Sequence, residues 1–317
     1  MADTRLTLDA IANARDVIDP IFLNTPQYVD AALSAQLGCE VLIKIETLNP
    51  IRCFKGRGAS LYMQEAVAAG ERVVGASAGN FGQAIAYAGR ARGVPVTIFA
   101  AETANAAKIA RIRDLGAEVV LTGRDFDAAK EAARAYAVSA PEVRFVEDAA
   151  DIETVIGAGT IGMELAAGSL DALLVPLGNG ALINGIATWL KAHSPQTRII
   201  GVVAANAPSM EISWRTGVPT TTETASTIAD GIGVRIPIAS AVDLTTRLVD
   251  EIVLVEENTI REALRLIRDA AGLLLEPSGA VGVAALLARP ELRTGKVGTI
   301  LTGSNYAANL LAELTGA

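Results

Sequence analysis

Short apolar runs alternate with longer amphipathic stretches along almost the whole chain. The runs are rich in Val, Ile and Leu and indicate strands, because β-branched residues favour the pleated, buried environment of a sheet. We expect strands at residues 41–45, 73–75, 96–99, 119–121, 173–175, 199–203, 252–255 and 297–301.

The stretches between these runs show helical spacing of their apolar positions. We expect helices at residues 58–69, 83–92, 106–115, 126–138, 183–192, 259–271 and 281–288, and an amphipathic helix near the N-terminus. Strand–helix alternation at this spacing predicts βαβ units and parallel sheets covered on both faces, an α/β fold. Eight strands also suit a closed barrel, but the turns described below favour open sheets.

Two segments interrupt the alternation. Residues 141–156 are acidic and lack a clear period, so we interpret them as a crossing between two lobes. Residues 206–237 are rich in Thr, Ser, Gly and Pro and are expected to wind over the surface.

Composition narrows the class of protein. The 317 residues are 51% hydrophobic and 20% charged, enough for a packed core, and the net charge of −8 disfavours nucleic acid or an anionic membrane as partner. No uncharged apolar stretch reaches the roughly 18 residues that span a bilayer. Cys39 and Cys53 are isolated, which disfavours a disulfide framework and suits a cytoplasmic location.

The single histidine, His193, removes several mechanisms. Any Ser-His-Asp or Cys-His site would need it, and a His-rich metal site is impossible. Because Pro195 follows closely, we expect His193 to be a solvent-facing residue at the end of a helix.

The strongest local signal surrounds Lys55. A strand is expected to end near Glu46, a turn with Asn49 follows, and a helix begins near Gly58. Ligands of α/β sheets bind at such strand–helix junctions. Crowded by Phe54 and by apolar strands, Lys55 would be a usable amine nucleophile. The alternative is an exposed first-turn lysine.

A second turn follows the strand at 73–75. Ser77, Ala78 and Gly79 are small enough to let backbone N–H groups point at an anion, and Asn80 and Gln83 add side-chain donors.

A third turn, between the strand at 173–175 and a helix, consists of Gly178, Asn179, Gly180, Ala181 and Leu182. A glycine-bearing loop at a helix N-terminus is a phosphate cradle, although an ordinary tight turn is equally compatible. It lacks the GK[ST] ending of a Walker A loop.

Two further turns carry Glu276, before a helix, and Thr302, where the strand at 297–301 ends and a last helix is expected. Each alone is compatible with a plain helix cap.

Together these five segments, in this order from Thr25 to Asn305, resemble the fold-type II pyridoxal-phosphate enzymes, in particular the threonine/serine dehydratases. The resemblance implies two open lobes like those of the tryptophan synthase β chain. Residues 1–66 and 151–317 would form a large cofactor-binding domain, and residues 67–150 a small mobile substrate domain.

The resemblance also implies roles. Lys55 would hold pyridoxal 5′-phosphate as a Schiff base, and Phe54 and Glu276 would lie around the cofactor. Residues 178–182 would bind its phosphate. Asn80 would bond the ring hydroxyl, Thr302 would face the ring nitrogen, and residues 77–80, with Gln83, would bind the substrate.

Several positions depart from the family pattern. Phe81 stands where histidine is frequent, Arg52 where glycine is, Cys53 where serine is usual, and Asn179 and Ala181 replace glycines of the phosphate loop.

Two other departures concern activity. Ala78 replaces the serine that similar racemases use as second acid/base, which disfavours racemisation. Val203 stands where relatives with a divalent cation carry glutamate, so we expect no such metal site.

A GxGxxG match at Gly157, Gly159 and Gly162 is interpreted as structural, because the acidic segment before it does not read as a strand.

The resemblance predicts β-elimination, with L-threonine, L-serine or a related β-hydroxy amino acid giving a 2-oxo acid and ammonia. The small amino acid would be the ligand, and look-alikes are commonly homodimers. Open alternatives are hydroxyaspartate dehydration (suggested by Arg52), β-replacement as in cysteine synthases, a non-catalytic cofactor- or small-molecule-binding protein and, more remotely, a flavin or nicotinamide oxidoreductase.

Overall fold

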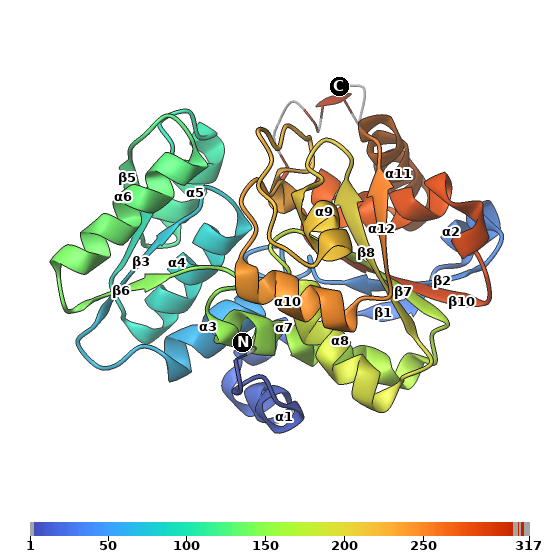
Figure 1. Ribbon diagram of the computed structural model, residues 1–317, viewed down its shortest axis with the longest axis horizontal. Coiled ribbons are helices and arrows are strands. Elements are labelled where there is room, and N and C mark those ends of the chain that lie inside the picture. Colours follow the sequence, from blue (N-terminus) through green and yellow to red (C-terminus); the bar gives the residue numbers. More distant parts are fainter. Residues whose placement is uncertain (1–2, 307–309, 311, 314–317) are drawn as a thin grey trace.

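The computed structural model describes residues 3–306, 310, 312 and 313, and contains two α/β lobes, each built on its own open sheet (Figure 1). The larger lobe has the strand order β1-β2-β10-β7-β8-β9. All neighbours in it pair in parallel except β1 and β2 at one edge. Its strands are β1 (Gln27–Val29), β2 (Glu40–Ile45), β7 (Ala172–Pro176), β8 (Arg198–Ala204), β9 (Glu251–Val255) and β10 (Lys296–Leu301).

The smaller lobe has four parallel strands in the order β5-β4-β3-β6. They are β3 (Arg72–Ala76), β4 (Val96–Ala100), β5 (Glu118–Leu121) and β6 (Val143–Val146). All eight expected strands are therefore present, and the α/β prediction with parallel sheets is confirmed. The sheet falls within residues 67–150, the range predicted for the substrate domain.

Two strands were not expected. β1 is a three-residue edge strand with an exposed central Tyr28, so it leaves no apolar run. β6 and the start of α7 both lie inside residues 141–156, so that segment is not a crossing over its whole length. Its Arg144 points outward and pairs with Glu71, which breaks the hydrophobic run although β6 pairs fully with β3. The crossing between the lobes is confined to the few residues after β6.

Helices cover both sheets (Figure 1). They are α1 (Leu8–Val17), α2 (Ala31–Leu37), α3 (Gly56–Glu65), α4 (Asn80–Arg92), α5 (Ala106–Asp114), α6 (Phe126–Ser139), α7 (Ile152–Leu165), α8 (Ala181–His193), α9 (Ser209–Thr216), α10 (Ala239–Leu248), α11 (Glu257–Ala271) and α12 (Pro277–Ala288). The expected helices are present and most begin two to four residues earlier than expected, because small or polar residues of the preceding turns form their first turns. α9 lies in the segment 206–237, which was expected to be irregular. The helix expected after β10 lies largely outside the described residues.

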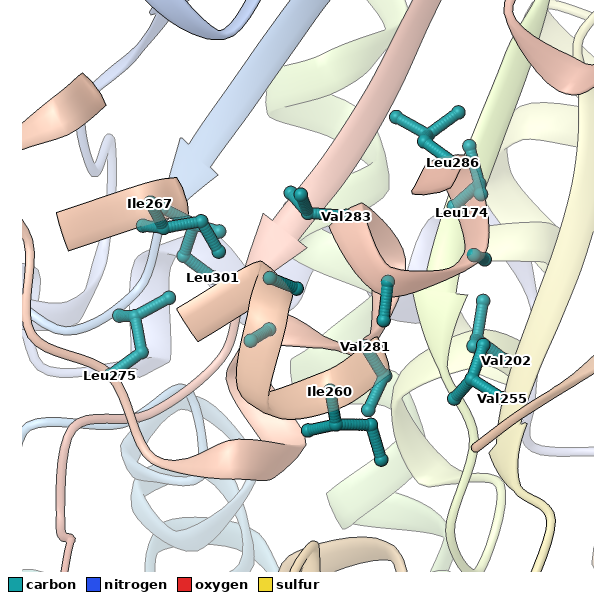
Figure 2. Close-up of a cluster of buried hydrophobic side chains, with 14 of the residues drawn as sticks. Leu174, Val202, Val255, Ile260, Ile267, Leu275, Val281, Val283, Leu286 and Leu301 are labelled. Carbon is teal, nitrogen blue, oxygen red and sulfur yellow. The ribbon is translucent and has the colours of Figure 1, made fainter. Parts of the chain in front are cut away.

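The main core lies between the six-stranded sheet and the pair α11 and α12 (Figure 2). Leu174, Val202 and Val255 from the strands meet side chains such as Ile260 and Val281 from the helices. Full burial of such a side chain contributes about 1.5–3 kcal/mol. α12 is buried on nearly every side, which is why its sequence is apolar throughout.

Helices α3, α7 and α8 touch through their backbones. A Cβ at Gly157 of α7 would lie 2.6 Å from the Cα of Gly58 in α3, and one at Gly185 of α8 would lie 2.7 Å from the backbone nitrogen of Gly159. The GxGxxG match therefore lies inside a helix and serves helix packing, which confirms its structural interpretation.

Candidate active site

Lys55 is the residue immediately before helix α3, and its side chain points into the space between the lobes. The turn that leads to it is held by Asn49, whose side-chain amide donates to the carbonyls of Glu46 (2.8 Å) and Cys53 (3.1 Å). Lys55 Nζ lies 2.5 Å from Asp148 Oδ2 and 4.6 Å from the centre of the Phe54 ring. Its side chain is only 16% exposed, so the alternative of an exposed first-turn lysine is wrong.

Arg57, two residues later, anchors this helix start. Its guanidinium is fully buried and donates to both Glu46 oxygens (3.0 and 2.8 Å) and to Glu164 (2.6 Å). Burial lowers the pKa of Arg57, but the two carboxylates outweigh it and raise the pKa overall. Lys44 balances the second negative charge through a 2.5 Å contact with Glu164. The backbone that carries Lys55 is thus fixed by a closed ionic network.

A cavity of about 790 Å³ opens in front of Lys55, between the carboxyl ends of the two sheets. All predicted site residues except Gln83 line it, namely Phe54, Lys55, Ser77, Ala78, Gly79, Asn80, Gly178, Asn179, Gly180, Ala181, Leu182, Glu276 and Thr302. Five turns that are far apart in the chain therefore converge on one amine.

Gln83 is the exception. It lies in the first turn of α4 but is fully buried, does not line the cavity, and neither side-chain polar atom has a protein partner. The predicted role of Gln83 as a donor to the substrate is not supported by this position.

The turn 178–182 offers unused donors at the start of α8. Gly180 has φ +98°, which only glycine adopts readily, and a 13-residue helix begins with the next residue. Among the described backbone hydrogen bonds, none uses an N–H of residues 178–183 as donor. Free N–H groups at the positive end of a helix dipole suit a phosphate. Asn179 and Ala181 need no positive φ, so the loss of glycine there leaves this geometry intact.

The turn 77–80 faces the cavity from the smaller lobe. Ser77 N–H donates to the carbonyl of Phe99 (3.1 Å), and Gly79 N–H donates to Ser77 Oγ (3.1 Å). The N–H groups of Ala78 and Asn80 have no acceptor among the described residues. This arrangement at the N-terminus of α4 suits a small carboxylate.

Hydrogen bonds join the Asn80 side chain to the larger lobe. Its Nδ2 donates to Glu276 Oε1 (2.5 Å), and its Oδ1 accepts from Asn305 Nδ2 (2.7 Å). Burial, aided by the charge of Asp230, raises the pKa of Glu276 to about 7, although the Asn80 hydrogen bond opposes the rise. Ser278 Oγ and Asn305 Oδ1 are buried without a protein partner.

The match to a family model decides what this site is. Residues 18–303 match the family described as pyridoxal-phosphate dependent enzymes. The chain belongs to this family. That confirms both the predicted family and the predicted cofactor, pyridoxal 5′-phosphate.

Relatives with named activities agree with this membership. The chain is 36% identical over 98% of its length to the L-threonine ammonia-lyase of Thermotoga maritima, of which it covers 78%. It is 42% identical over 86% of its length to that of Geobacter sulfurreducens, of which it covers 69%. Among solved structures, the processed form of threonine deaminase isoform 2 from Solanum lycopersicum matches with a TM-score of 0.91 and 29% identity, covering 99% of this chain and 94% of that one.

The residues present fit a phosphorylated pyridine aldehyde. The amine of Lys55 is the group that bonds an aldehyde, the unused N–H groups at 178–183 suit the phosphate, and the Phe54 side chain offers an apolar wall. The Thr302 side chain, which makes no described hydrogen bond, lines the same cavity. The buried Ser278 Oγ, which lines the cavity and has no protein partner, is what a missing polar ligand would leave behind.

Two residues near the cavity were missed by sequence reasoning in different ways. Asn305 follows closely after Thr302 in the same turn, yet its position as hydrogen-bond partner of Asn80 depends on the fold. Asp148 had no motif at all, and lies 93 residues from Lys55 along the chain.

Some departures from the family pattern now have a structural setting. Arg52 adopts φ +54°, a conformation natural to the usual glycine, and it is exposed and does not line the cavity. Phe81 lines the cavity. Cys53 is completely buried, which raises the pKa of its thiol. His193 is exposed at the end of α8 and stacks on Trp189.

Ion pairs join the lobes across the cavity mouth. Lys108 of α5 pairs with Asp230, and Arg235 Nε donates to Asp127 of α6 (2.8 Å). In residues 3–306, 310, 312 and 313 there is no cluster of three His, Cys, Asp or Glu side chains placed to bind a metal. Over the same residues, no helix has the length and apolar character needed to cross a bilayer.

Proposed function

We propose that this chain is a pyridoxal-phosphate-dependent ammonia-lyase acting on L-threonine, L-serine or a related β-hydroxy amino acid. The reaction yields a 2-oxo acid and ammonia. The observation that carries the proposal is the position of Lys55 Nζ in a cavity whose two other walls offer separate sets of free N–H groups. Two relatives of the chain are L-threonine ammonia-lyases, which points the same way.

Each wall has a distinct task. Lys55 binds the cofactor covalently through Nζ, residues 178–182 bind its phosphate, and Asn80 and Thr302 bond the polar atoms of its ring. When bound, the cofactor supplies the electron sink that acidifies the Cα proton of the amino acid and lets a β-substituent leave. A neutral Thr302 hydroxyl, unlike a carboxylate, does not hold a proton on the ring nitrogen.

The substrate is held by the smaller lobe. Its carboxylate accepts from the free N–H groups of the turn 77–80, which directs Cα toward the larger lobe. Once the amino acid has displaced it, Lys55 is an amine beside Cα and removes the Cα proton. Ala78 carries no hydroxyl that could return a proton from the opposite side, so the site favours elimination over racemisation.

The hydroxyaspartate alternative loses its original support. It was motivated by Arg52, which lies outside the cavity wall. The cations that do line the mouth, such as Lys108 and Arg235, are already paired with aspartates. A neutral substrate side chain therefore fits this site better than a second carboxylate.

The test is a rate comparison with serine, threonine, hydroxyaspartate and O-acetylserine, measuring 2-oxo acid and ammonia. We expect the fastest turnover with serine or threonine and at least about a thousandfold loss in Lys55→Ala, because no other amine can replace a covalent catalyst. Turnover of hydroxyaspartate or replacement on O-acetylserine at a higher rate would overturn the substrate assignment. A visible band that shifts on adding amino acid without any product would indicate a binding protein.

We also propose that the protein works in the cytoplasm as a homo-oligomer, most simply a dimer. Free Cys39 and the buried free thiol of Cys53 suit a reducing compartment. Sedimentation of the holoenzyme measures the oligomeric state.

A further inference from the structure

Asp148 is the one described carboxylate that contacts the catalytic amine. It lies in the short loop between β6 and α7, the crossing from the smaller to the larger lobe, and its Oδ2 is 2.5 Å from Lys55 Nζ. Both side chains are 16% exposed. Nothing in the motifs or the proposed roles accounts for this contact.

The fold holds Asp148 in place. The next residue, Ala149, has φ +66°, a strained conformation for a residue with a Cβ, and its N–H donates to Thr154 Oγ1 (3.0 Å). Glu147 N–H donates to Asp151 Oδ2 (2.7 Å), which closes the loop from the other side. The backbone on both sides of Asp148 is therefore held by hydrogen bonds within the loop and to the start of α7.

The neighbouring carboxylate, Glu147, has cationic partners of its own. Glu147 also lines the cavity but is neutralised by Lys130 (3.1 Å) and Arg134 (2.6 Å) of α6. Among the described residues, Lys55 is the single cation in contact with Asp148, and Asp148 Oδ1 is buried with no partner. The ion pair with Lys55 is therefore the one described contact that compensates the charge of this buried carboxylate.

The other charged groups along the cavity wall do not compete for Lys55. Three ion pairs account for most of them, namely Lys108 with Asp230, Arg235 with Asp127 and Arg124 with Asp125. Glu276 accepts hydrogen bonds from Asn80 and Asn305. The remaining charged residue of the cavity wall is Glu223.

We propose that Asp148 is a positioning residue that aims the ε-nitrogen of Lys55 at the cavity through this ion pair. It stabilises the positive charge that Lys55 acquires when it takes the Cα proton, and in the resting enzyme it stabilises the protonated linkage to the cofactor. The inference rests on the proposed function for the identity of that linkage, but the pairing itself belongs to the protein alone.

The first measurement follows the visible absorbance of the bound cofactor against pH in the wild type and in Asp148→Asn. An opposite charge at this distance favours the protonated form by about 1–3 pH units, so the midpoint at which the long-wavelength band is lost should fall by at least about one unit in the variant. Asp148→Glu should keep most of the wild-type midpoint. Glu147→Gln is the matched control, because it removes an adjacent cavity carboxylate that does not touch Lys55, and its midpoint should stay close to that of the wild type.

The second measurement needs no cofactor. Apoprotein is treated at pH 8 with trinitrobenzenesulfonate, which reacts with neutral amines, and labelling of the Lys55 peptide is followed by mass spectrometry. Loss of Asp148 should speed labelling of Lys55, because the carboxylate that holds Nζ in an ion pair is removed. Circular dichroism establishes folding, and Asp148→Ser replaces the Asn variant if the latter does not fold.

The outcomes separate the two proposals. Unchanged labelling and an unchanged midpoint in Asp148→Asn overturn the role of Asp148, even if the enzyme is an ammonia-lyase. A wild type that forms no visible band overturns the proposed function, and faster Lys55 labelling in the apoprotein variant then still supports the pairing.

Discussion

Glu276 makes the stability of the protein dependent on pH in a direction opposite to that of an ordinary ion-paired carboxylate. Burial raises its pKa from an ordinary value of 4.5 to about 7. The folded state therefore holds this proton more tightly than the unfolded state, so the contribution is complete below pH 4.5 and is lost as the pH rises through 7. Integrating between these values, the apoprotein should lose about 2–3 kcal/mol of unfolding free energy from pH 5 to pH 8 through this group.

Glu276→Gln removes the titration while keeping an oxygen that accepts from Asn80. Urea unfolding of the cofactor-free protein gives the unfolding free energy of wild type and variant at pH 5 and at pH 8. The free energy of the variant minus that of the wild type should be about 2–3 kcal/mol larger at pH 8 than at pH 5, and this change is the contribution of the Glu276 proton. Glu256→Gln is a matched control, because Glu256 precedes α11 as Glu276 precedes α12 but is exposed. A wild-type-to-variant difference that is the same at both pH values would refute the reasoning.

Two further predictions concern the framework. Arg57→Met should lower the unfolding free energy by about 3–5 kcal/mol, because it leaves the buried Glu46 and Glu164 carboxylates without their shared cation. The control Arg247→Met, at a surface ion pair, should lower it by about 0.5 kcal/mol or less. Equal losses in urea unfolding would contradict this reasoning. Gly185→Ala should cost about 1–3 kcal/mol, because its Cβ would overlap the Val155 carbonyl oxygen. Thermal unfolding measures this loss, and a stabilised variant, as expected of a glycine in an open helix, would show that α7 and α8 do not touch through their backbones.

The elements that could be predicted are those whose cause is local. A strand buried on both faces is apolar at nearly every position, so β4 and β7 were visible as runs. β1 and β6 escaped because their faces differ, with exposed Tyr28 in one and ion-paired Arg144 in the other. Whether such a segment forms a strand depends on its pairing with a neighbouring strand, and that neighbour lies outside the local sequence.

The same distinction applies to the site. Residues around Lys55 and in the turn 178–182 were predicted because each turn is contiguous and its chemistry follows from small residues before a helix. Asp148 depends on the path of the chain over 93 residues, and the burial of Gln83 depends on packing within the smaller lobe. Neither property leaves a trace in local sequence.

The backbone contacts among α3, α7 and α8 have a consequence for how the two lobes would move relative to each other. With no side chain between Gly58 and Gly157, these helices have little room to slide, so Lys55 shares the frame of the larger sheet. The turn at Ser77 belongs instead to the other sheet. Any rocking of the lobes would therefore change the distance between Lys55 and the turn at Ser77 while the position of Lys55 in the larger lobe stays fixed. Under the proposed function, approach of the amino acid and retention of the coenzyme would then be adjusted separately.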